Sequence, residues 1–276
     1  AAKPREHGAP EKTPKFATLS EDAIWGVFID GRDAQYGSLA YGEDYRDTMT
    51  TALRGVYDMA KAGEGPLTMD HFGKIVQLLD IGWRDYEPRF ADTLKCLPAL
   101  PKDVSDLVMS DDIKNLTSVP AAEAERYVEV LLEQYNREQE QSSIDKVGPL
   151  VNLLRRLAWV HPLYDRNGRS RLLLLQLELR RKGIAGGTMR FNNNRNIYVE
   201  TADMHRKRIE EGLSMYDRVA QAGPGWRPNP WLVRTGADGA FYDLHCPSYA
   251  SALQKCWRSC DHCGPGDMLG LLQVPA

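Results

Sequence analysis

The stretch HPLYDRNGRSRLLLL, residues 161–175, places a histidine, an aspartate, an Asn-Gly pair and arginines in a turn before a leucine-rich run. Burying so many polar groups without partners would be costly, so the turn either faces water without a role or holds an anion. Asn167 and Gly168 stand where the unpaired N–H groups of a helix N-terminus would cradle an anion. Glycine also permits a close approach of the backbone to a ligand. The turn therefore has the composition of a phosphate site.

Three further side chains of this turn would supply the chemistry of phosphoryl or nucleotidyl transfer. Arg169 offers a planar fork for phosphate oxygens, and Asp165 is a hard oxygen ligand for a Mg²⁺ ion that bridges phosphates. His161, at the end of the preceding helix, is of the residue type that takes a proton from a hydroxyl near neutral pH. The alternative is purely local: His161 ends a helix, Asp165 and Asn167 form an ordinary turn, and the arginines are solvated. Turn chemistry alone does not readily bring all these groups together within nine residues.

The stretch HPLYDRNGR resembles the active-site motif of the Fic family, which reads His-Pro-Phe-x-Asp/Glu-Gly-Asn-Gly-Arg-x-x-Arg. Two stretches before it, MDHFGKIVQLLDIGWRDYEPRF and DKVGPLVNLLRRLAWVHP, resemble the helices that lead to this motif in the family, so the similarity covers about residues 40–220. The resemblance implies an all-α domain that transfers AMP, or another nucleotide-derived phosphate group, from ATP or another nucleotide. The acceptor would be a Ser, Thr or Tyr hydroxyl of a target protein.

By position in the motif, the resemblance assigns His161 as the general base on the target hydroxyl and Asp165 as the Mg²⁺ ligand. It places the nucleotide phosphates on Asn167, Gly168 and Arg169. Catalysis would then consist of positioning the reactants and stabilising charge, as phosphoryl chemistry generally requires.

Three positions depart from the family pattern. Leu163 replaces the usual Phe, which is a change of packing. Arg166 stands where a Gly is expected, and it would either add a phosphate contact or crowd the cradle. Leu172 occupies the place of the second Arg, while Arg171 comes one residue early, about 100° around the helix from the expected face. We include Arg166 and Arg171 among the candidate nucleotide-binding residues and expect the terminal phosphate to be handled differently from the family pattern.

Two alternative functions follow from the same turn. One is the transfer of phosphate or phosphocholine instead of AMP. The other is a catalytically inactive Fic-like binding module, which Arg166 and Leu172 favour but which has no need of His161. The chain has no match to the family's inhibitory motif, Ser/Thr-x-x-x-Glu-Gly/Asn, and this suits a secreted bacterial effector or toxin.

Helical periodicity dominates the chain around the turn, and we expect an all-α, Fic-like helical bundle with a short β-hairpin flap and an irregular C-terminal extension. The segment 83–118 is expected to be rich in loops, with residues 83–105 as the candidate flap. Ile144 is expected on a core-facing stripe that Pro149 divides into two helical pieces. The predicted helices cover about residues 42–63, 68–82, 120–141, 142–160, 168–183 and 202–223.

The expected domains are a flexible N-terminal arm over residues 1–18, a Fic-like catalytic domain over residues 19–222 and a cysteine-containing extension over residues 223–276. The Asn-rich stretch 190–196 would either line the adenine side of the site or form a surface loop. In the extension, four thiolates would satisfy tetrahedral Zn²⁺, while disulfides or free thiols are the alternatives. These cysteines are Cys246, Cys256, Cys260 and Cys263.

Composition excludes two classes of partner. The net charge of −3, from 35 basic and 38 acidic residues, gives no overall cationic field for nucleic acid. No run of about 18 apolar residues occurs, so we expect no transmembrane segment. The expected partners are a nucleotide and a hydroxyl-bearing protein substrate. The expected setting is a soluble protein, in a bacterial cytoplasm or secreted into a target cell.

Overall fold

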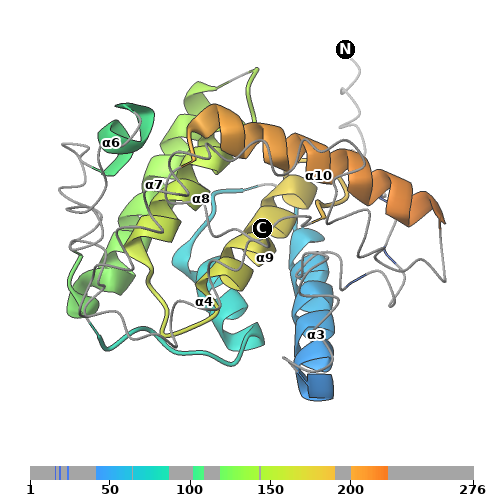
Figure 1. Ribbon diagram of the computed structural model, residues 1–276, viewed down its shortest axis with the longest axis horizontal. Helices are drawn as coiled ribbons and strands as arrows, with labels where there is room; N and C mark the ends of the chain where they lie inside the picture. The colour runs from blue at the N-terminus through green and yellow to red at the C-terminus, as the bar shows by residue number, and fades with distance from the viewer. Residues whose placement is uncertain are drawn as a thin grey trace, which may run out of the picture.

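The computed structural model describes residues 42–63, 65–86, 102–108, 119–142, 144–189 and 200–222, together with Phe16, Leu19 and Ile24. Its elements, in chain order, are α3 (Gly42–Ala60), α4 (Met69–Leu78), α6 (Lys102–Val108), the 3-10 turn η2 (Ala121–Glu123), α7 (Ala124–Gln141), α8 (Gly148–Val160), α9 (Asn167–Arg181) and α10 (Ala202–Ala222) (Figure 1). These ranges contain no strand, only one isolated antiparallel bridge between Trp83 and Leu163. The predicted all-α class is confirmed for this part of the chain. Residues 87–101, which hold most of the predicted flap, lie outside it.

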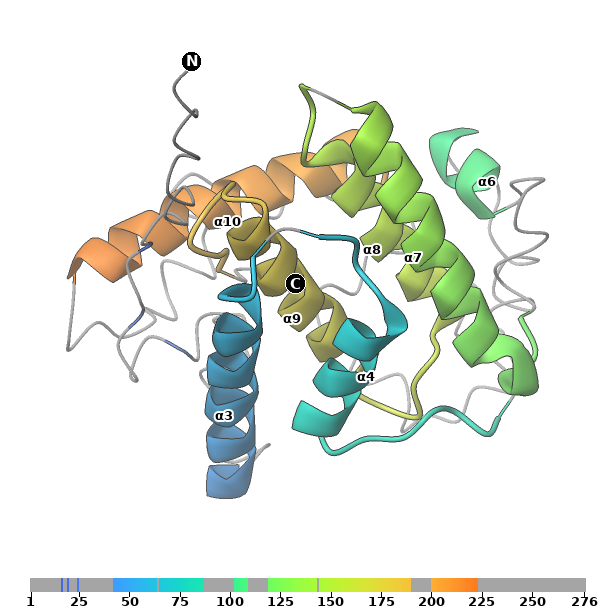
Figure 2. The ribbon, with the colours of Figure 1, turned by 180° about the vertical axis from the view of Figure 1, so that it is seen from behind.

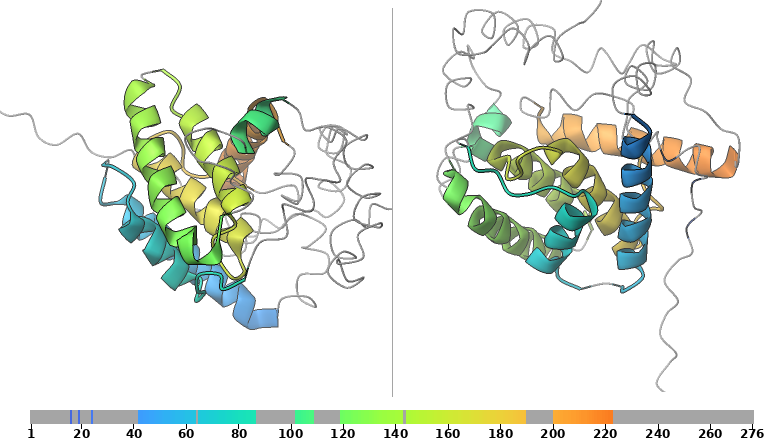
Figure 3. Two further views of the ribbon diagram at one scale, coloured as in Figure 1. Left: turned by 90° about the vertical axis from the view of Figure 1, so that its left-hand side faces the viewer. Right: turned by 90° about the horizontal axis from the view of Figure 1, so that it is seen from below.

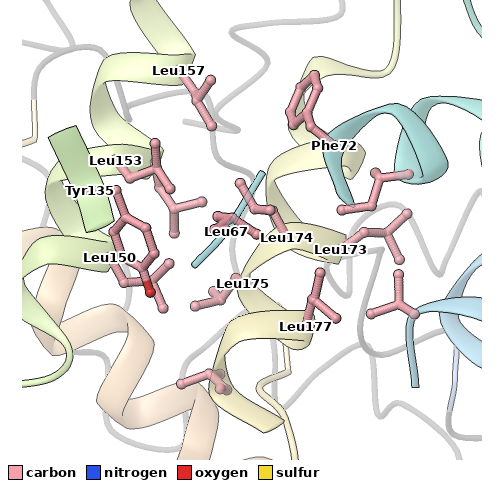
Figure 4. Close-up of a cluster of buried hydrophobic side chains, with 14 of the residues drawn as sticks. Leu67, Phe72, Tyr135, Leu150, Leu153, Leu157, Leu173, Leu174, Leu175 and Leu177 are labelled. Carbon is pink, nitrogen blue, oxygen red and sulfur yellow. The ribbon is translucent and has the colours of Figure 1, made fainter. Parts of the chain in front are cut away.

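Helix α9 forms the centre of the bundle, as its leucine content predicts. It is enclosed by α7 and α8 on one side and by α3 and α4 on the other (Figures 1 and 2). Figure 4 shows its leucines between Leu150, Leu153 and Leu157 of α8 and Phe72 of α4. Each fully buried side chain of this size contributes roughly 1.5–3 kcal/mol. The turn that opens α9 is therefore attached to the most deeply buried element of the fold.

Helix α8 begins later than the sequence predicts. Pro149 lies in its first turn, where a missing N–H costs nothing, and so it starts the helix and does not divide it. The predicted core position of Ile144 is wrong, because this side chain precedes the helix and is 95% exposed. The buried face of α8 instead starts at Pro149 and continues through Leu150 and Val151.

The expectation that segment 83–118 is irregular is wrong for residues 102–108, which form α6. This short helix buries Val104 and Leu107 and packs against α8. The Asp103 carboxylate lies 2.9 Å from Nη2 of Arg155, which is almost fully buried in α8. Seven residues are too few for a clear helical period, so packing against α8 stabilises a helix that the local sequence does not predict.

The remaining helix limits follow local signals. Helix α3 ends before Gly63, whose φ of +88° suits glycine. Helix α4 begins after Thr68, where the His71 side chain bonds to the Thr68 backbone N–H at 3.3 Å, and it ends at Leu78, four residues before the predicted Gly82. None of the helices in the described ranges is both long and apolar enough to cross a membrane.

Helix α10 crosses the bundle from the α8 side toward α3 (Figures 1 and 3). Near its start, Arg206 donates to the Asp145 carboxylate just before α8, with 3.0 Å between Nη1 and Oδ1. Farther along, the Tyr216 hydroxyl accepts from Arg180 in the last turn of α9 at 2.9 Å. These contacts tie α10 to the helices on both sides of the candidate site.

Candidate active site

The turn between α8 and α9 holds two residues in the left-handed backbone region. His161 ends α8 with a φ of 47°, and Arg166 precedes α9 with a φ of 60°. In the described ranges only one other residue apart from glycine, Asp80, has a positive φ. Such conformations cost of the order of 1–3 kcal/mol and persist where surrounding contacts impose them, often at functional sites. The contacts that impose them here come from inside the turn, from α4 and from residues 82–86.

The buried Asn167 side chain closes the turn from inside. Its Nδ2 donates to the Leu163 carbonyl at 2.8 Å, and its Oδ1 accepts from the Leu163 N–H at 3.0 Å. The sequence assigned Asn167 to phosphate binding. Because its amide is engaged with the backbone, the group of Asn167 that suits an anion is the backbone N–H at the start of α9.

Arg166 connects the turn to α4. Its guanidinium donates to the carbonyl of Leu79, at the C-terminal end of α4, where a cation is favoured by the helix dipole. The side chain thus contributes to holding the turn, while its predicted phosphate contact stays a prediction.

Residues 82–86 pair with the other side of the turn. The Arg84 N–H donates to the Pro162 carbonyl at 3.0 Å, and the Tyr164 N–H donates to the Gly82 carbonyl at 3.1 Å. The Tyr86 hydroxyl donates to the Tyr164 carbonyl at 3.2 Å, and the two tyrosine rings meet edge to face at 5.9 Å. The backbone on both sides of Leu163 is therefore fixed from outside the turn.

His161 is uncharged at neutral pH. Burial, followed by the charges of Arg171 and Arg84, lowers its pKa to about 4, while the Asp165 carboxylate acts in the opposite direction. A neutral imidazole has a ring nitrogen that can accept a proton. The residue that the sequence identified as the base is thus held in the protonation state that a base needs.

Arg171 lies beside the N-terminus of α9 and is only 6% exposed. A Cβ atom placed on Gly168 would lie 3.9 Å from Nη2 of Arg171, as expected for a helical side chain that points back toward the N-terminus. The same guanidinium acts on the pKa of His161. Leu172 is 7% exposed, so an arginine at that position would be buried. Position 171 therefore brings a guanidinium to the N-terminal turn of α9, whereas the side chain at position 172 is buried.

Asp165 and Arg169 form the outer edge of the turn. Nη2 of Arg169 lies 3.5 Å from Oδ2 of Asp165, and the Asp165 side chain is 62% exposed. Mg²⁺ at nucleotide sites is commonly held by one or two carboxylates, with phosphates and waters as the other ligands. No cluster of three His, Cys, Asp or Glu side chains occurs in the described part of the chain. An accessible carboxylate beside the N-terminus of α9 fits Mg²⁺ that would arrive with a nucleotide.

Three buried residues near the site were not among the predicted site residues. His205 and Glu200 pair at 3.1 Å between Nδ1 and Oε2, and burial together with the charges of Arg171 and Arg155 lowers the pKa of His205. A carboxylate only accepts hydrogen bonds, so Nδ1 of His205 carries the proton in this pair. Arg84, 3% exposed, is the third residue. Glu200 and His205 lie outside the motif, so its spacing could not identify them, whereas Arg84 lies in the stretch MDHFGKIVQLLDIGWRDYEPRF, which resembles the segment before the motif.

Other predicted groups lie outside the described residues, namely the Asn-rich stretch 190–196 and the four cysteines of the extension. Comparison with known proteins adds no family assignment, because no family model matches the chain and no curated protein matches it.

Proposed function

We propose that this chain is a Fic-type transferase, which moves AMP or another nucleotide-derived phosphate group to a Ser, Thr or Tyr hydroxyl of a target protein. The observation that carries the proposal is the uncharged His161 next to an N-terminal helix turn that also holds the Arg171 guanidinium. A proton acceptor beside an anion-binding helix end is the pair of functions that transfer to a hydroxyl requires. The motif HPLYDRNGR supports the same family.

In the proposed reaction, the neutral imidazole of His161 takes the proton of the target hydroxyl. The hydroxyl oxygen forms a bond to the α-phosphorus as the bond from that phosphorus to the leaving phosphate oxygen breaks. The imidazolium then returns its proton to solvent. A base of this kind typically contributes about 10²–10⁴-fold to the rate.

The phosphates would be held at the start of α9. The backbone N–H groups of Asn167 and Gly168 lie in its first turn, and the positive end of the helix dipole favours an anion there. Arg169 and Arg171 would add charge-assisted hydrogen bonds to phosphate oxygens. Asp165 would hold Mg²⁺, and a bound Mg²⁺ would neutralise part of the phosphate charge.

The donor is tested with a panel of labelled nucleotides that includes ATP, UTP, GTP and CDP-choline. Each is incubated with the full chain, Mg²⁺ and a cell lysate, and the mass added to a target protein is measured. CDP-choline tests the transfer of phosphocholine. ATP also tests the transfer of phosphate, which adds a different mass to the target than AMP does. His161→Asn is the test variant, because Asn tolerates the positive φ at this position.

We expect the His161→Asn variant to lose transfer by about 10²–10⁴-fold while its nucleotide affinity stays near that of the parent. Ile144→Ser is the matched control, because this exposed side chain lies outside the site. Full transfer by the His161→Asn variant would refute the proposal. Nucleotide binding without transfer by the parent, on every donor, would favour the inactive binding module.

A further inference from the structure

Three segments of the chain meet at the side chain and backbone of Arg84. Its guanidinium donates through Nη1 to the Tyr86 carbonyl at 2.8 Å and through Nη2 to the Val119 carbonyl, just before η2. Its backbone N–H donates to the carbonyl of Pro162 at 3.0 Å. Arg84 is 3% exposed, so these hydrogen bonds are formed away from bulk water, where an unpaired carbonyl would be costly.

These hydrogen bonds fix the chain directly after the base. Pro162 directly follows His161, whose left-handed conformation has to be imposed by its surroundings. The hydrogen bond from the Arg84 guanidinium to the Tyr86 carbonyl orders the backbone of residues 84–86. From this segment the Tyr86 hydroxyl donates to the Tyr164 carbonyl. A single arginine thus organises the contacts at positions 162 and 164.

Arg84 also acts on His161 electrostatically, through its positive charge. Three charged groups act on this imidazole: Arg171 from α9, Arg84 from the 82–86 segment, and Asp165 from the turn itself. The two arginines favour the neutral ring, and Asp165 favours the protonated ring. Replacing the Arg84 side chain would leave the backbone bond to Pro162 in place, but it would release the Tyr86 and Val119 carbonyls and take away one of the charges that lower the pKa of His161.

We propose that Arg84 is a positioning residue for His161, holding the turn that carries the base by joining residues 84–86, Val119 and Pro162. This inference rests on the proposed function, because it assumes that His161 is the base. A lysine could not replace the arginine, since one ammonium lacks the planar fork that reaches two carbonyls in fixed directions.

The test compares Arg84→Met and Arg84→Lys with the parent in the full chain. The first readout is the titration of the His161 imidazole by NMR, assigned by the signal that disappears in His161→Asn. The second is the rate of transfer. Arg126→Met is the matched control, because the Arg126 side chain is 75% exposed and pairs with Glu123 at the surface. Circular dichroism and thermal melting establish that each variant is folded.

In Arg84→Met we expect His161 to titrate at a higher pH than in the parent, and transfer to fall by about 10²-fold through misplacement of the base. Arg84→Lys keeps the positive charge, so we expect a smaller rise in the titration together with a similar loss of transfer. The conservative variant remains informative if burial of methionine prevents folding.

Parental transfer in both variants would overturn the proposal, whatever the titration. A loss of transfer in a folded Arg84→Met variant with an unchanged titration of His161 would also overturn it, because Arg84 would then act on the fold and not on the base. If the parent itself transfers no group from any nucleotide, the proposed function fails, and the titration alone decides whether Arg84 acts on His161.

Discussion

His161 should make the fold sensitive to acid between pH 6.5 and pH 4. Its pKa lies at about 4 in the folded chain and near 6.5 when unfolded, because burial and two arginines disfavour the imidazolium. Between these values the unfolded chain takes up a proton that the folded chain does not. The stability associated with neutral His161 is therefore fully present above pH 6.5 and is lost as the pH falls through 4. The gap between the two pKa values corresponds to about 3 kcal/mol.

The measurement is the free energy of unfolding by urea at several pH values from 7.5 to roughly 3.5, for the parent and for His161→Asn. Asparagine accepts the positive φ of 47° and does not titrate in this range. Subtracting the two curves removes the contributions of the other histidines, His71 and His205 among them, whose pKa values are also lowered. We expect the difference to be constant above pH 6.5 and to decrease by about 3 kcal/mol on acidification.

Two parallel curves would refute the reasoning, since they would mean that His161 takes up its proton equally well in the folded and unfolded chains. A difference that changes in the opposite direction would mean that the folded chain favours the imidazolium, which would place Asp165 and not the arginines in control. Either result would show that burial and the arginines do not lower the pKa of His161 in the folded chain.

Three substitutions test the packing that supports the site. Glu178→Gln should destabilise the fold by about 3–5 kcal/mol in urea unfolding, because the buried Arg181 guanidinium, 2.5 Å from the Glu178 carboxylate, would lose its counter-charge. A loss below about 1 kcal/mol would contradict this expectation. Gly212→Ala should lower the melting temperature through a loss of about 1–3 kcal/mol, because its Cβ would lie 2.6 Å from the Met189 carbonyl oxygen, and an unchanged melting temperature would show that the contact relaxes. Leu172→Arg should destabilise the fold by placing a charge in the core, whereas tighter nucleotide binding at parental stability would show that position 172 faces the cradle.

The long helices could be predicted because their apolar positions recur with the helical period and their ends carry local signals. Thr68 and Gly63 mark limits through the chemistry of the residue itself, and the leucines of α9 predict a buried central helix. Helix α6 could not be predicted, because it owes its stability to Val104 and to the pairing of Asp103 with Arg155. These contacts join positions far apart in sequence.

The candidate site, like the fold, could be predicted from the sequence only in part. Residue type and spacing predict His161 as a base, but its lowered pKa depends first on burial and then on the charges of Arg171 and Arg84, which only the fold determines. Asn167 and Arg166 were predicted from the motif to contact phosphate, yet both side chains form hydrogen bonds to backbone carbonyls in the folded chain. The motif shows which side chains lie in the turn. The direction in which each one points depends on the groups that it contacts in the folded chain.

Under the proposed function, Arg171 would take the role of the second arginine of the Fic motif from the neighbouring position. Leu172 lies in the core face of α9, so an arginine there would have to compete with the packing of the central helix. Arg171 lies on a neighbouring face, and its side chain extends back along the helix toward Gly168, beside the unpaired N–H groups. A long and flexible side chain can reach the same anion from an adjacent position, whereas a buried leucine position cannot accept a guanidinium cheaply. If the proposed function holds, the packing of α9 in the core explains why the arginine stands at position 171 and not at position 172.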